Sequence, residues 1–93
     1  MPIEPSTPIA FSPLHRLQWE EAQQKFVILY PEGMVELNGP AAEILQLCDG
    51  TRKIDDIVLA LETKFETSGL RSDIEELLDA ALKNGWIRLL SEG

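Results

Sequence analysis

The sequence predicts an α+β protein: a winged helix-turn-helix-like domain with a three-stranded antiparallel sheet followed by a three-helix bundle. The spacing of the apolar residues changes along the chain. Up to residue 37 they alternate or run together, which is typical of strands, and from residue 38 they recur every three or four residues, which is typical of helices. With 93 residues in all, the chain is long enough for one modest hydrophobic core.

The first thirteen residues hold four of the six prolines, and their apolar residues show no periodicity. Proline-rich segments of this kind are typical of extended linkers and chain ends. We therefore expect residues 1–13 to form a flexible Pro-rich N-terminal tail and residues 14–93 to form the folded domain.

Three strands are expected next, over residues 16–20, 26–30 and 34–37. In the first, Leu17 and Trp19 alternate with polar residues and share one face, whereas the second is apolar on both faces, as in a central strand. The run Pro31-Glu32-Gly33 predicts a three-residue hairpin loop closed by a left-handed glycine. Short connections make the sheet an antiparallel meander, and the third strand then lies at its edge.

Three helices should follow. Asn38 is a good N-cap for the first, which should end at Asp49-Gly50, and the second should cover residues 54–65. The third begins with the capping-box pattern Ser72-Asp73-Ile74-Glu75 and should stop at residues 84–85. Residues 86–90 favour an extended conformation.

The charge narrows the choice of partners. Sixteen acidic against eight basic residues give a net charge of −8, and the basic residues are scattered. Such a chain is repelled by phosphate backbones and anionic lipid, so we expect neither nucleic acid nor a membrane as partner. The single cysteine, Cys48, and the lack of a visible secretory signal favour a cytoplasmic location.

The residues offer little for catalysis, and we expect no enzyme activity, no metal site and no cofactor. His15 has no neighbouring nucleophile in the sequence, and Cys48 falls on the apolar face of the first helix. No phosphate-binding loop or hydrolase motif occurs. Two alternatives stay open: a winged-helix transcription regulator, and a small acidic carrier protein modified at Ser72.

A binding module is the best remaining interpretation. An exposed edge strand at residues 34–37 can accept an extended peptide as a further strand. The third helix has a wide apolar surface, in which Ile74, Leu77 and Ala81 point one way while Leu78 and Leu82 flank them. One of these rows could line a groove beside the strand, or both could belong to the core.

Residues 16–90 resemble the pyrroloquinoline quinone biosynthesis protein D (PqqD) family. The most specific match is the run Leu29-Tyr30-Pro31-Glu32-Gly33-Met34, and further matches are Arg16-Leu17-Gln18-Trp19-Glu20 and the closing Gly85-Trp86-Ile87. The resemblance implies a domain that recognises ribosomally made precursor peptides. It also implies binding of the precursor peptide PqqA and its presentation, as by a chaperone, to the radical S-adenosylmethionine (SAM) enzyme PqqE.

The resemblance further implies that the peptide adds to the third strand and packs against the third helix. The expected peptide-binding residues are Met34, Val35, Glu36, Leu37, Ile74, Leu77, Leu78, Ala81 and Leu82. On this basis Leu78→Asp should weaken peptide binding and leave the fold largely intact. An unoccupied edge strand could also pair with its own copy and form a homodimer.

Overall fold

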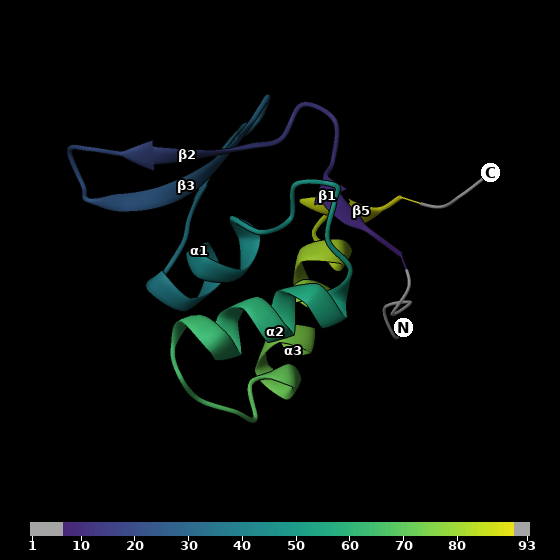
Figure 1. Cartoon of the computed structure of the whole chain (residues 1–93). Helices are drawn as coiled ribbons and strands as arrows, with labels where there is room; N and C mark the ends of the chain where they lie inside the picture. The colour runs from purple at the N-terminus through teal and green to yellow at the C-terminus, as the bar shows by residue number, and fades with distance from the viewer. Residues whose placement is uncertain (1–6, 91–93) are drawn as a thin grey trace.

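The computed structural model describes residues 7–90, which form one α+β unit (Figure 1). Along the chain the elements are β1 (Ile9–Phe11), β2 (Arg16–Glu20), β3 (Lys25–Tyr30), β4 (Gly33–Glu36), α1 (Gly39–Leu45), α2 (Ile54–Lys64), α3 (Arg71–Lys83) and β5 (Ile87–Leu89). The predicted fold class is confirmed, with a three-stranded antiparallel sheet preceding three helices.

The three-stranded sheet has the order β2-β3-β4, so β3 is central and β4 lies at an edge, as the sequence predicts. The hairpin loop differs from the prediction. Gly33 pairs with Tyr30 as the first residue of β4, so only Pro31 and Glu32 form the loop. Two-residue loops are a common hairpin connection. Neither Pro31 nor Glu32 has a positive φ, so this loop does not have the primed turn geometry that is most frequent in such hairpins.

The prediction of a flexible tail over residues 1–13 is wrong for its later part, while residues 1–6 lie outside the described residues. Ile9–Phe11 forms β1, which pairs antiparallel with β5. Ile9 is completely buried, and its backbone carbonyl accepts the N–H of Gly50 at 2.9 Å. Gly50 has a φ of +90°, a conformation that favours glycine. The partners of β1 lie far away in the sequence, so no local periodicity could reveal it.

Local sequence signals place the first helix. Asn38 has an extended backbone, and its side-chain oxygen accepts the N–H of Ala41 at 2.8 Å, as expected for an N-cap. The helix is short and ends at Leu45, before the predicted stop. Cys48 nevertheless packs into the core beyond the helix end.

The other two helices have the predicted extents within a few residues, but the capping box predicted at Ser72–Glu75 is absent. The third helix already begins at Arg71, so Ser72 lies inside its first turn. The backbone N–H of Leu70, just before the helix, is bound by the carboxylate of Glu62 on α2 at 3.0 Å. At the start of α3, a backbone N–H is therefore bound by a side chain of another helix and not by a side chain of α3 itself, as in a capping box.

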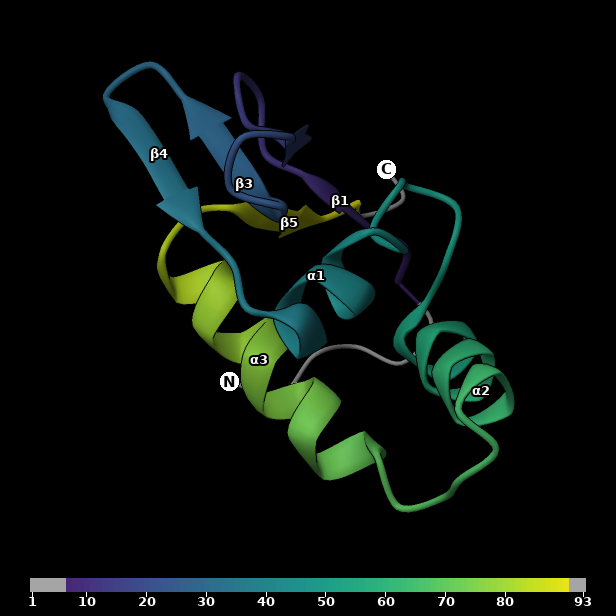
Figure 2. The same cartoon turned by 90° about the vertical axis from the view of Figure 1, so that its left-hand side faces the viewer.

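The core lies between the sheet and the helices. Figure 2 shows α1 between the three-stranded sheet above it and the pair α2 and α3 below. Of the three helices, α1 packs most closely on β3, while α3 packs on β5 and α2. The buried residues that fill this space include Ile28 from the sheet, Leu45 and Ile57 from the first two helices, and Leu78 from the third.

Candidate functional site

The free edge of β4 offers main-chain groups for pairing. Leu37 follows β4, and its N–H donates to the carbonyl of Phe26 at 3.0 Å, which places it in a hydrogen-bonded pair. Hydrogen-bonded and non-hydrogen-bonded pairs alternate along an antiparallel ladder. The main-chain N–H and C=O groups of Val35 therefore point toward β3, whereas those of Met34 and Glu36 point away from β3, toward the free edge. Within residues 7–90, no strand pairs with this edge.

The side chains of this segment divide between core and surface. Val35 packs against the core, and Leu37 is buried. Met34 has 45% of its surface exposed, and Glu36 is exposed beside Lys25, with 3.4 Å between the ammonium nitrogen and a carboxylate oxygen. Of the four residues predicted here, Met34 and Glu36 therefore expose their side chains on the surface, whereas Val35 and Leu37 direct theirs toward the core.

The burial of the residues predicted on α3 does not follow the two rows that the sequence suggests. Ile74, Leu78 and Ala81 are buried in the core, whereas Leu77 and Leu82 are half-buried against it. A Leu78→Asp substitution would place a charge in the core and destabilise the fold. This substitution therefore does not separate peptide binding from folding, and the surface of α3 open to a partner carries Leu77 and Leu82.

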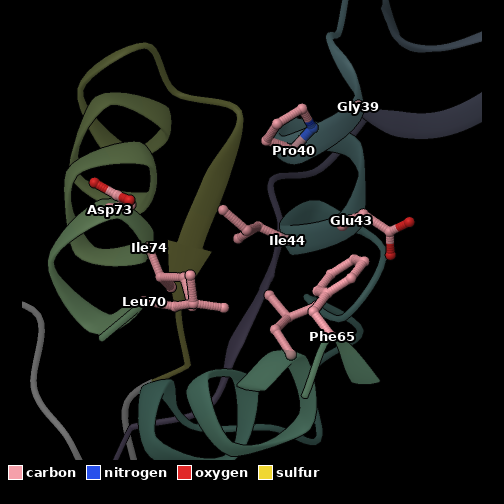
Figure 3. Close-up of a pocket in the computed structure, with 9 residues that line it drawn as sticks. Gly39, Pro40, Glu43, Ile44, Phe65, Leu70, Asp73 and Ile74 are labelled. Atoms are coloured by element: carbon pink, nitrogen blue, oxygen red, sulfur yellow. The ribbon is translucent and has the colours of Figure 1, made fainter. Parts of the chain in front are cut away.

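A pocket of about 520 Å³ opens between the start of α1, the end of α2 and the first turns of α3 (Figure 3). It is mostly apolar. The residues that line it are Gly39, Pro40, Glu43, Ile44, Leu61, Phe65, Leu70, Asp73 and Ile74. Of the predicted peptide-binding residues only Ile74 lines it, so sequence reasoning largely missed this pocket.

The sequence contains little signal for two of these residues, Phe65 and Leu70. Phe65 ends the apolar stripe of the second helix, yet half of its surface is exposed, which a purely structural stripe residue would not show. Leu70 lies in the connection between α2 and α3, where no periodicity applies. Only the packing of the three helices brings these side chains to one place.

The described residues contain no arrangement suited to catalysis or metal binding. Within residues 7–90, no group of three or more His, Cys, Asp or Glu residues could hold a metal ion. Burial, together with the nearby charge of Asp49, raises the pKa of the Cys48 thiol to about 12, so this thiol stays protonated at neutral pH. The ring of His15 stacks on Tyr30, with 5.4 Å between the ring centres.

The geometry argues against the alternative of a DNA-binding transcription regulator. Ser72 lies in the first turn of α3, and the exposed residues on this helix include Asp73, Glu75 and Glu76. An acidic face of this kind is repelled by a DNA backbone. In the part of the chain that the structure describes, no helix has the length and apolar character needed to cross a membrane.

Comparisons with known sequences agree with this picture. The family "Coenzyme PQQ synthesis protein D (PqqD)" matches residues 25–87. A protein of Methylococcus capsulatus named "PqqA binding protein" is 57% identical over 88 residues, which cover 95% of each chain. Proteins of the same name from Azotobacter vinelandii and Klebsiella pneumoniae are 51% and 48% identical, over 80% and 85% of this chain and 82% and 87% of theirs.

A solved structure shows the same fold. The solution NMR structure of the PqqD truncation of Methylobacterium extorquens PqqCD, described as a stand-alone recognition element for ribosomally synthesized and post-translationally modified peptides, superposes with a TM-score of 0.77. The match covers 92% of this chain and 94% of that one, at 23% identity. The sequence relatives are named for binding PqqA and not for a reaction, in agreement with the expectation that the chain is no enzyme. The chain belongs to the coenzyme PQQ synthesis protein D (PqqD) family.

Proposed function

We propose that this protein binds the precursor peptide PqqA by strand addition at β4 and presents it to the radical SAM enzyme PqqE. The observation that carries the proposal is the unpaired edge of β4, where the main-chain groups of Met34 and Glu36 point outward. An extended peptide can bond to these groups in register. The relatives named for PqqA binding support the choice of peptide.

Main-chain bonds alone would bind a small peptide weakly, because ordering the peptide costs conformational entropy. Apolar surface next to the strand adds to the affinity. The half-buried Leu77 and Leu82 on α3, and the exposed Met34 on β4, are the predicted residues that offer such surface. Ile74, Leu78 and Ala81 act in this proposal only by holding α3 in place.

Presentation would work by tethering. A peptide held on a carrier that also contacts the enzyme reaches an effective concentration of roughly millimolar at the active site. The chemistry would belong to PqqE, and this chain would supply recognition. We place this activity in the cytoplasm, where the buried free thiol of Cys48 would remain reduced.

An amide NMR titration with the PqqA peptide of Methylococcus capsulatus tests strand addition. We expect saturable shifts at residues 33–37, with the β1–β5 pair, which forms a separate sheet, unchanged. Saturable shifts that leave residues 33–37 unchanged would overturn the assigned edge. The absence of binding at millimolar peptide would overturn the function itself.

Two further measurements cover the remaining parts of the proposal. Size-exclusion chromatography of the chain with PqqE and peptide should show co-elution, and separate elution with and without peptide would contradict presentation. Dilution of the free protein addresses the homodimer. Shifts at residues 33–37 that depend on protein concentration would show that a second copy competes for the edge.

A further inference from the structure

We propose that the pocket between α1, α2 and α3 takes a large apolar side chain of the bound peptide, and that Asp73 at its rim binds a basic residue beside that side chain. The inference rests on the proposed function and adds a specificity element to it. The pocket lies outside the strand edge itself, and its residues are contributed by all three helices.

The path of an added strand leads to this pocket. After Glu36 the chain passes through Leu37 and Asn38 and reaches Gly39 and Pro40, which form one wall of the pocket. Figure 2 shows β4 running toward the start of α1. An extended chain advances about 3.3 Å per residue, so a peptide paired with β4 would arrive at this wall three or four residues beyond the paired segment.

The size and lining of the pocket suit one bulky side chain. Its volume of about 520 Å³ lies in the range of pockets that hold drug-sized ligands, so a large aromatic side chain fits with room to spare. Figure 3 shows the ring of Phe65 and the side chains of Ile44 and Leu70 converging on the space. Because Phe65 has half of its surface exposed, an inserted apolar side chain would remove apolar surface from water on both sides of the contact.

The charges at the rim of the pocket favour a basic residue in the peptide next to the inserted apolar side chain. Two carboxylates flank the pocket, from Glu43 on α1 and Asp73 on α3. The Glu43 carboxylate already has a partner, the ammonium of Lys64, at 2.6 Å. Within residues 7–90, the side chain of Asp73 makes no hydrogen bond or ion pair, so its negative charge is available to a lysine or arginine of the peptide.

The net negative charge of the chain disfavours a second copy of this chain as the occupant of the pocket. The whole chain carries a net charge of −8, so two copies repel each other, and a peptide with basic residues is attracted. A basic, apolar peptide segment therefore matches the pocket in both lining and charge.

Two substitutions with matched controls test the pocket. Phe65→Ala removes the exposed ring just after α2, and Leu59→Ala removes an exposed apolar side chain of α2 that does not line the pocket. Asp73→Asn removes the free charge, and Glu76→Gln removes another exposed carboxylate of α3 outside the pocket. Circular dichroism establishes that all four variants are folded, and calorimetry at low salt measures their affinity for the Methylococcus capsulatus PqqA peptide.

We expect Phe65→Ala to weaken binding about tenfold, as for a central aromatic contact, and Asp73→Asn to weaken it about threefold. The two controls should bind like the unsubstituted protein. Replacing the basic residues of the peptide by alanine, one at a time, should reveal one position at which Asp73→Asn causes no further loss. That coupling would identify the partner of Asp73.

The outcomes separate this inference from the function on which it rests. If the unsubstituted protein binds PqqA and the four variants bind equally well, the pocket assignment is wrong and the peptide function stands. Equal losses in the controls would also overturn it. If sedimentation shows a dimer that Phe65→Ala dissociates without peptide, the occupant is a second copy and the inference fails. If the unsubstituted protein binds no peptide, the proposed function itself fails.

Discussion

The side-chain oxygen of Asn38 accepts the backbone N–H of Ala41 at 2.8 Å, and this bond caps α1, which is separated from the end of β4 by only two residues. The same short segment therefore ends the free strand edge and begins the wall of the helical pocket. Gly39 and Pro40, which lie inside this capped turn, line the pocket. The cap thus fixes the position of the pocket relative to the strand edge.

Loss of this cap should lower the stability of the whole domain. Asn38→Ala leaves the first N–H groups of α1 without the side-chain acceptor, and we expect the free energy of unfolding to fall by about 1 kcal/mol. Asn38→Asp keeps an acceptor oxygen and should retain most of the stability. Urea denaturation of the three proteins measures the difference, and equal midpoints for Asn38→Ala and the unsubstituted protein would contradict the prediction.

The first strand should be essential to the fold. Ile9 is completely buried in the core, so Ile9→Ala should cost about 2–5 kcal/mol of unfolding free energy. Leu14, with 78% of its surface exposed, provides the control, because Leu14→Ala should change the stability by less than about 0.5 kcal/mol. Thermal and urea unfolding would show a similar loss in both variants if β1 were dispensable.

A single N–H on the strand edge gives a sharp test of strand addition. Glu36→Pro removes an outward N–H while leaving the bonds from β4 to β3 intact, because proline is tolerated at such edge positions. Glu36→Ala also removes the side chain and its pairing with Lys25 but keeps the N–H. We expect Glu36→Pro to bind PqqA at least about tenfold more weakly than Glu36→Ala, since one hydrogen bond is lost and one carbonyl is left unpaired. Equal affinities would show that the peptide does not use this edge.

The buried thiol predicts a dependence on pH. The pKa of Cys48 is raised from 9.0 to about 12 in the folded protein, so the folded state holds this proton more tightly than the unfolded state. The contribution of Cys48 to the free energy of unfolding is fully present below pH 9.0 and is lost as the pH rises toward about 12. Between these two values the folding equilibrium constant should fall about tenfold per pH unit. Urea denaturation at pH 8 and pH 10.5 measures this loss of stability. The loss between the two pH values should be smaller in Cys48→Ala than in the unsubstituted protein, because the variant has no thiol at this position.

The reactivity of the same thiol offers an independent check. At pH 8 a disulfide reagent should react slowly with the native protein and rapidly in urea, because attack requires the thiolate. Equally fast reaction in both conditions would show that Cys48 is accessible in the folded state.

Local sequence signals determined the three-stranded meander, the three helices and the Asn38 cap, because each depends on periodicity or on side chains a few residues apart. The free edge of β4 also followed from the sequence, since short connections fix the strand order.

Tertiary structure alone decided three other features. Ile9–Phe11 became a strand through pairing with β5, and the start of α3 is bound by Glu62 of α2 where the sequence suggested a capping box at Ser72. The third feature is which apolar residues of α3 face the core. Periodicity groups residues by helical face but does not say which face meets the core or which side chains of other helices meet beside it. For that reason the pocket at Phe65 and Asp73 emerges only from the packed fold.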